Sequence, residues 1–150
     1  MTIDIQFYHL SVTPLEKALP RLLEKALASG FKSLVLCESD IAVARLNDAL
    51  WSYHPNRFLP HGSAKDGFAA RQPIYLTAKE ENPGKADLLV ITDGAQIDNL
   101  SDFKRLIDIF DGSKPESATA AEKRMEHYRA KGHNVNIIRQ SSTGEWQKAA

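Results

Sequence analysis

The sequence predicts an α/β domain in three layers, in which helices cover both faces of a mainly parallel sheet. Two features of the chain predict this class. Short apolar segments with strand-like spacing alternate along the sequence with amphipathic segments of helical spacing, as in proteins built from strand–helix–strand units. The segment Leu88–Ile91 is apolar at every position, which is typical of a central strand that is covered on both faces.

The chain is predicted to begin with a strand and a long helix. Residues 3–7 alternate between apolar and polar side chains, as in a strand with one buried face. The helix is expected to start with Thr13 as its cap and Glu16 completing a capping box, and to end at Gly30. We expect Pro20 to kink or locally loosen this helix, because proline cannot donate a backbone hydrogen bond.

A second strand and helix follow. Ser33–Cys37 is a short apolar strand, and Ser39 is placed to cap a helix whose apolar residues extend from Ile41 to Leu50. Residues 51–72 then combine aromatic, proline and glycine residues without a period. This composition indicates an irregular loop, with room for one short strand at Phe58–Leu59.

The C-terminal half is predicted to alternate in the same way. Ile74–Leu76 and Leu88–Ile91 have the composition of strands. Residues 101–112 carry apolar side chains at helical spacing and are predicted to form a helix that Ser101 caps. A further helix is expected at 118–128, and a last strand at 135–138.

These elements predict one domain, because 150 residues suffice for a sizeable core but not for two typical domains. We predict a single Rossmann-like domain over residues 1–140. Residues 141–150 are predicted to be a frayed tail, from which Trp146 is able to pack back on the body. Cys37, the single cysteine, lies in an apolar strand and is predicted to be a buried, unreactive side chain.

The composition indicates a folded, soluble protein. Hydrophobic residues make up 43% of the chain, and no segment approaches the ~20 apolar residues that cross a membrane. The N-terminus carries no targeting signal, so we expect a cytoplasmic protein without a membrane partner. Nineteen basic residues balance nineteen acidic ones, which argues against tight direct binding to nucleic acid, since phosphate binding favours a basic excess.

The sequence contains no motif for phosphate, metal or covalent chemistry. The turn after the first strand has no glycine to let backbone amides approach a pyrophosphate, and no P-loop occurs. The five histidines lack the short spacings of zinc sites. Asp93 and Gly94 resemble the acidic end of a magnesium-binding strand, but Asp-Gly is also favoured in plain turns, and we interpret it as a turn. We therefore predict no enzyme activity, no cofactor and no catalytic residue.

Two segments have the composition of interaction surfaces. Residues 51–62 combine three large aromatic side chains with prolines in a stretch too irregular for one core element. Trp51 and Phe58 either plug the edge of the core or form a binding surface. In the last predicted helix, basic residues on the polar side form either a solvated face or a binding site. These residues are Lys123, Arg124, Arg129 and Lys131.

Two motifs in the centre of the chain are distinctive. Leu46-Asn47-Asp48-Ala49-Leu50-Trp51 is followed by Phe58-Leu59-Pro60-His61-Gly62. The motifs around them are Phe7-Tyr8-His9-Leu10, Leu34-Val35-Leu36-Cys37-Glu38, Leu88-Leu89-Val90-Ile91 and Tyr128-Arg129-Ala130-Lys131-Gly132-His133. In this order and at this spacing, the motifs resemble the DNA polymerase III chi subunit family, and the resemblance spans nearly the whole chain.

The resemblance implies a non-catalytic accessory subunit of the clamp-loader assembly. Such a subunit pairs with the psi subunit and binds the C-terminal tail of single-stranded DNA-binding protein (SSB), so its contact with DNA is only indirect. In the family the psi contact uses the aromatic loop, which corresponds here to Trp51, Phe58, Pro60 and His61. The resemblance therefore favours a binding surface over a core edge for this segment.

The resemblance also implies a tail-binding pocket on the late helix. Its candidate residues here are Lys123, Arg124, Tyr128 and Arg129. The family pattern is Ala-Arg-x-Arg-aromatic, whereas this chain has Glu122 at the first arginine and Met125 at the aromatic position. This departure predicts a tail contact that is weakened, moved or lost, and a weak contact would use Lys123 or Arg124 as its cation.

Two other functions remain open from the sequence. A degenerate nucleotide-binding domain is suggested by the predicted sheet and by Asp93, but the missing phosphate cradle argues against it. A direct binder of single-stranded DNA would need a basic groove with exposed stacking aromatics, and the net charge of zero argues against it.

Overall fold

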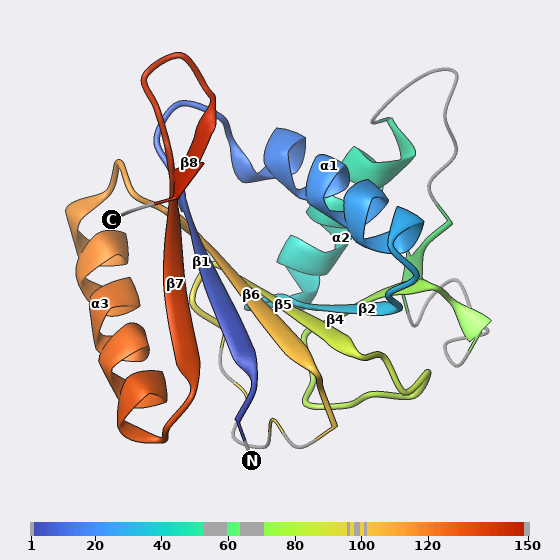
Figure 1. The fold of residues 1–150 in the computed structure, drawn as a ribbon. Coiled ribbons are helices and arrows are strands. Elements are labelled where there is room, and N and C mark those ends of the chain that lie inside the picture. Colours follow the sequence, from blue (N-terminus) through green and yellow to red (C-terminus); the bar gives the residue numbers. More distant parts are fainter. Residues whose placement is uncertain are drawn as a thin grey trace.

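The computed structural model describes residues 2–52, 60–63, 71–95, 97, 100 and 102–148. These residues form an α/β fold with one eight-stranded sheet and three helices (Figure 1). The strands are β1 (Asp4–Leu10), β2 (Ser33–Leu36), β3 (Gly62–Ser63), β4 (Ile74–Thr77), β5 (Leu88–Thr92), β6 (Arg105–Asp111), β7 (Asn134–Gln140) and β8 (Trp146–Lys148). The helices are α1 (Leu15–Ala28), α2 (Asp40–Trp51) and α3 (Pro115–Ala130).

The sheet is mainly parallel, as the sequence predicted. Its strands lie in the order β3-β4-β2-β5-β6-β1-β7-β8. All neighbouring pairs are parallel except the last, in which β8 runs antiparallel to β7. The strands β5 and β6 therefore lie in the middle of the sheet, and β3 and β8 form its two opposite edges.

Alternate side chains of the strands fill two hydrophobic clusters, one on each face of the sheet. In β2, Val35 belongs to the cluster with α1 and α2, while Leu34 and Leu36 belong to the cluster with α3. Figure 1 shows the same division, with α1 and α2 together and α3 alone. From the segment between β5 and β6, Ile97 and Leu100 pack against the α3 cluster.

The helix boundaries follow from local chemistry, with one correction. The backbone N–H of Ala42 donates to Oγ of Ser39 at 3.1 Å, which confirms the predicted cap of α2. Gly30 ends the α1 region with a φ of +87°, as predicted. The predicted Thr13 cap of α1 is wrong, because Pro14 occupies the cap position and makes no side-chain cap bond. Helix α1 continues through Pro20.

The helix predicted over residues 101–112 is wrong, because Arg105–Asp111 form the central strand β6. The apolar residues of this segment do recur at helical spacing, but they also alternate between the two faces of the sheet. Leu106 and Phe110 belong to the α3 cluster, whereas Ile109 belongs to the α1 and α2 cluster. Asp108 lies between them and is fully buried, so its polar side chain concealed the strand pattern.

The prediction of a frayed tail from residue 141 is also corrected, because β8 pairs with β7 in an antiparallel hairpin. Gln140, the last residue of β7, also joins this hairpin to the turn after β1, because its Oε1 accepts hydrogen bonds from the backbone N–H groups of residues 11–13 at 3.0–3.1 Å. The predicted return of Trp146 to the body is confirmed, since its ring packs edge-on against Tyr8 at 5.1 Å between centroids.

Two further features bear on the predictions. The short strand predicted at Phe58–Leu59 lies outside the described residues, and the described edge strand near it is β3. Cys37 is buried as predicted, and burial raises the pKa of its thiol to about 11. In the described part of the chain, the helices are too short or too polar to span a membrane.

Candidate partner-binding sites

The first candidate site is a groove of about 840 Å³ between α3 and the segment that follows β5. We call it the α3 groove and define it by Ile97, Leu100, Lys123, His127, Tyr128 and Lys131. The α3 helix is positioned by Ala121 and Met125, which are buried in the cluster on this face of the sheet. Ile97 and Leu100, from the segment between β5 and β6, lie across the groove from the helix.

Basic side chains line one wall of the α3 groove. Lys123, His127 and Lys131 follow one another at intervals of four residues, so they form a single row along α3 and its C-cap. All three are exposed. Ile97 and Leu100 form an apolar surface opposite this row, where they pack on the core cluster. A cation row beside an apolar surface suits a ligand that carries both carboxylates and a hydrophobic group.

Arg124 has a different role from its neighbours, because its guanidinium binds a buried carboxylate. Its Nε lies 2.7 Å from Oδ2 of Asp108, and its Nη2 lies 3.0 Å from Oδ1. Only 10% of the Arg124 side chain and none of the Asp108 side chain is exposed. The pair is therefore a bidentate ion pair that joins α3 to the central strand β6.

Burial raises the pKa of Asp108, while the hydrogen bonds and the charge of Arg124 act in the opposite direction. The carboxylate depends on Arg124 because no water can reach it to replace the lost hydration. Arg124 lines the α3 groove from its inner side, but its hydrogen-bond donors are already directed at Asp108. It is thus poorly placed to be the main cation for an external ligand.

Tyr128 forms part of the floor of the α3 groove. Its ring packs against Phe7 at 6.1 Å and against His133 at 6.3 Å between centroids, and only 7% of the residue is exposed. Burial and the carboxylate of Asp108 raise the pKa of Tyr128 to about 12, so the phenol stays neutral. Tyr128 therefore offers the groove an apolar edge.

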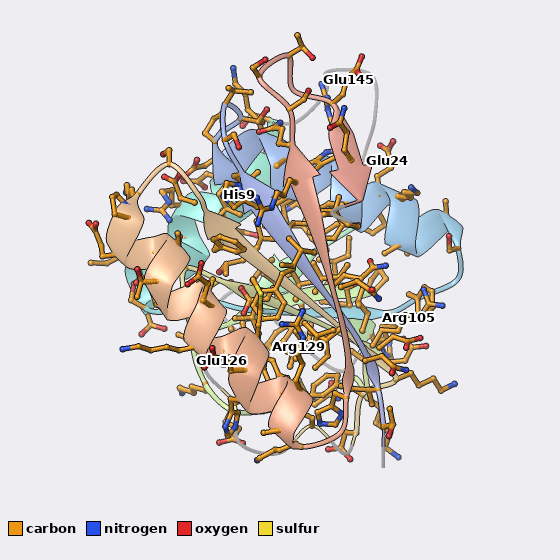
Figure 2. The ribbon with its side chains drawn as sticks, turned by 60° about the vertical axis from the view of Figure 1, so that its left-hand side comes forward. His9, Glu24, Arg105, Glu126, Arg129 and Glu145 are labelled. Carbon is orange, nitrogen blue, oxygen red and sulfur yellow. The ribbon has the colours of Figure 1, made fainter. Side chains whose placement is uncertain are left out.

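Arg129 is not brought together with the other candidates. It is exposed and lies on the side of α3 toward β7, away from the α3 groove (Figure 2). Glu122 is exposed and likewise does not line the groove, and Met125 is buried in the core. Glu122 and Met125, the two departures from the family pattern, therefore lie outside the α3 groove.

The second candidate site lies near the β3 edge of the sheet, at the C-terminal end of α2. Trp51 is 55% exposed, and its ring contacts that of His61 edge-on at 4.8 Å between centroids. His61 is 5% exposed and directly precedes the edge strand β3, while Pro60 is half-buried. Phe58 lies outside the described residues. An exposed tryptophan supported by a buried histidine has the character of an interface anchor.

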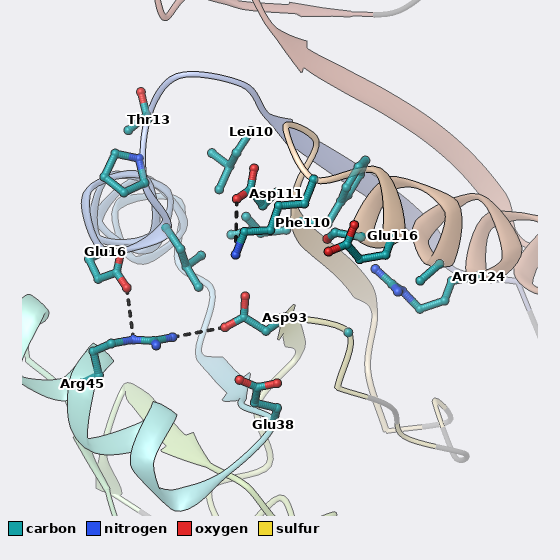
Figure 3. Close-up of a pocket in the computed structure, with 17 residues that line it drawn as sticks. Leu10, Thr13, Glu16, Glu38, Arg45, Asp93, Phe110, Asp111, Glu116 and Arg124 are labelled. Carbon is teal, nitrogen blue, oxygen red and sulfur yellow. Dashed lines mark hydrogen bonds and ion pairs between the residues drawn. The ribbon is translucent and has the colours of Figure 1, made fainter.

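A third cavity, of about 490 Å³, lies at the carboxyl ends of β1, β2, β5 and β6 (Figure 3). Parallel α/β sheets often bind nucleotides at this position. Here Arg45 bridges Glu16 at 3.0 Å and Asp93 at 3.2 Å, and Glu38 adds a further carboxylate. Burial and the charge of Glu38 raise the pKa of Asp93. This acidic lining would repel a triphosphate.

Among the described residues, no group of three or more histidine, cysteine, aspartate or glutamate side chains is arranged to hold a metal ion. Asp93 occupies a turn with a φ of +51°, followed by Gly94 at +76°, which agrees with the predicted Asp-Gly turn. The cavity thus gives the nucleotide-binding alternative no structural support.

Sequence reasoning missed several residues of the α3 groove. His127 was passed over, although its spacing from Lys123 and Lys131 was a readable signal. Ile97 and Leu100 carry no such signal, because the apolar residues around them show no helical or strand spacing in the sequence. The ion pair of Arg124 with Asp108 could not be predicted for another reason. Asp108 was placed in the helix predicted over residues 101–112, whereas it lies in the strand β6.

Comparison with known proteins agrees with the motifs. The model of the family "DNA polymerase III chi subunit, HolC" matches residues 1–136. A probable DNA polymerase III subunit chi of Rickettsia prowazekii is 35% identical, over 98% of this chain and 92% of its own length. The DNA polymerase III subunit chi of Haemophilus influenzae is 27% identical over 91% of this chain and 96% of its own. The corresponding subunit of Escherichia coli is 27% identical over 72% and 74%. The chain therefore belongs to the DNA polymerase III chi subunit family.

Proposed function

We propose that this chi subunit is a non-catalytic adaptor that links the clamp loader, through the psi subunit, to the C-terminal tail of SSB. The adaptor would be a three-layer, Rossmann-like scaffold that carries the two partners on separate surfaces. The observation that supports this function best is the α3 groove, where Lys123 and Lys131 flank an apolar surface. An acidic tail that ends in phenylalanine offers carboxylates and one aromatic group, which match these two parts.

The proposed psi surface is formed by Trp51, Pro60 and His61, with Phe58 as a further candidate from the family resemblance. The proposed tail surface is formed by Lys123, Tyr128 and the rest of the α3 groove, with Arg124 holding α3 in place. Arg129 contributes to the tail surface only if the peptide extends across α3 toward β7. The proposed psi surface lies beside the edge strand β3, whereas the α3 groove lies between α3 and the segment after the central strand β5. The two proposed surfaces share no residue, so neither partner is expected to obstruct the other.

We expect a peptide that copies the acidic tail of SSB to bind the native chain weakly and the Lys123→Ala/Lys131→Ala variant about three- to tenfold more weakly. The reason is the loss of two partly exposed ion pairs, each worth up to ~1 kcal/mol. Such pairs are salt-sensitive, so binding should weaken further once the Debye length falls below ~8 Å. Fluorescence anisotropy of a labelled peptide measures both effects.

The matched controls are Arg129→Ala and Glu122→Arg, which change charge on α3 outside the groove. Arg129→Ala is expected to change the affinity by less than about twofold. Glu122→Arg restores the family pattern and would tighten the complex only if the tail crossed that side of the helix. If Arg129→Ala weakens the peptide and the Lys123→Ala/Lys131→Ala variant does not, the tail does not occupy the α3 groove.

A further inference from the structure

A second groove crosses the other face of the sheet, between α1 and the strands β1 and β7. Two adjoining cavities of about 470 and 460 Å³ form it, and they share side chains of all three elements. We call it the α1 groove and define it by Tyr8, Arg21, Lys25, Arg105, Asn136 and Trp146. On β1 it is lined by Asp4, Gln6 and Tyr8, a span of about 13 Å at the rise of a strand.

The α1 groove is basic although the chain as a whole is neutral. Arg21 and Lys25 are both exposed and lie one turn apart on α1, so they present two cations along one wall. Arg105 stands at the far end, where its guanidinium lies 5.2 Å from the centre of the Phe31 ring. Among the described lining residues, Asp4 is the only carboxylate. The acidic cavity at the carboxyl ends of the strands holds the compensating charge.

The floor of the α1 groove combines aromatic rings with side-chain amides. Tyr8 and Trp146 form an edge-on pair with centroids 5.1 Å apart, and Trp146 remains 37% exposed. The amides of Gln6 and Asn136 lie on the same floor, beside the cation wall. Aromatic rings on an open sheet face, next to a row of cations, are the means by which many proteins hold unpaired bases.

We propose that the α1 groove binds single-stranded nucleic acid. Arg21, Lys25 and Arg105 contact the phosphates, and the bases lie against Tyr8 and Trp146. An acidic peptide could also bind the cations, but it would have no flat groups to stack on the rings and amides of the groove floor. A polynucleotide offers both anions and flat aromatic groups, which match the cations and the pair of rings in this groove. The proposal goes beyond the adaptor role and does not depend on either protein partner.

The test is fluorescence anisotropy of a labelled oligothymidylate with the full chain in low-salt buffer. We expect binding by the native chain and at least about tenfold weaker binding by Arg21→Ala/Lys25→Ala. The slope of log affinity against log salt concentration should also become shallower by about 0.7 for each cation removed. Trp146→Ala is expected to weaken binding by about tenfold through lost stacking, while Trp146→Phe retains most of the affinity. Circular dichroism checks that each variant is folded.

The matched control is Lys79→Ala/Lys85→Ala, which removes two exposed lysines from the connection between β4 and β5. It lowers the net charge by the same amount outside the groove and should bind the oligonucleotide as the native chain does. The proposal is overturned if the native chain does not bind in low salt, or if this control loses as much affinity. It is also overturned if Arg21→Ala/Lys25→Ala weakens an acidic peptide but not the oligonucleotide.

Discussion

Arg124→Leu is expected to destabilise the fold by about 3–5 kcal/mol, because it leaves the carboxylate of Asp108 buried without a counter-charge. Asp108 lies in the central strand β6 with no exposed surface, so water cannot replace the two lost hydrogen bonds. Urea unfolding followed by circular dichroism measures the loss. The double variant Asp108→Leu/Arg124→Met should recover much of it, since an apolar pair of similar size needs no charge partner.

The stability of Arg124→Leu is also expected to depend on pH, and the direction of this dependence follows from the pKa of Asp108. Burial raises the pKa of Asp108, and without Arg124 nothing opposes that rise. A carboxyl whose pKa is higher in the folded state contributes stability at low pH, and this contribution is lost as the pH rises through the folded pKa. The deficit of Arg124→Leu relative to the native chain should therefore be smaller at about pH 5 than at about pH 7. A deficit that is equal at both values would show that Asp108 is not the group left unpaired.

Trp51→Ala is expected to weaken binding to the psi subunit by about 2 kcal/mol or more, roughly 30-fold in affinity, and to leave the fold intact. The expectation of an intact fold follows from the exposure of the ring, of which more than half is in solvent. Its contact with His61 is lost, but no buried cavity forms. Isothermal titration calorimetry with purified psi subunit measures the affinity.

Ile41→Ala is the matched control for this prediction. Ile41 lies at the other end of the same helix and is 81% exposed, so its truncation removes apolar surface without touching the proposed psi contact. Its affinity for psi should equal that of the native chain. If Trp51→Ala is unfolded by circular dichroism, Trp51 is a core residue, and if it binds psi normally the interface lies elsewhere.

Most of the fold could be predicted from the sequence because strand and helix spacings are local signals. The helix cap at Ser39 and the helix end at Gly30 could be predicted for the same reason, since caps and left-handed turns depend on the residue itself. The segment 105–111 was not, because an apolar run that is buried on both faces fits a helix as well as a strand. What decided its structure was pairing with β1 and β5, which spacing along the chain does not reveal.

The candidate surfaces could be predicted only in part. Trp51 was identified by composition and by family resemblance, and its exposure agrees with that identification. Arg124 was identified as a surface cation, but it is held by a carboxylate sixteen residues away in sequence. The α1 groove was out of reach for sequence reasoning, because it joins Arg21 to Trp146 across the whole length of the chain. The net charge of zero gave no sign of this basic groove, because acidic residues elsewhere in the molecule balance its cations.

The most direct test of the adaptor account is whether one molecule of this chain holds both partners at once. Psi subunit is immobilised on a sensor, the chain is captured, and SSB is then added in the absence of DNA. The account predicts a second binding step that Lys123→Ala/Lys131→Ala weakens without affecting capture by psi, and a first step that Trp51→Ala removes. The account is contradicted if SSB displaces the chain from psi, or if Lys123→Ala/Lys131→Ala abolishes capture by psi while remaining folded.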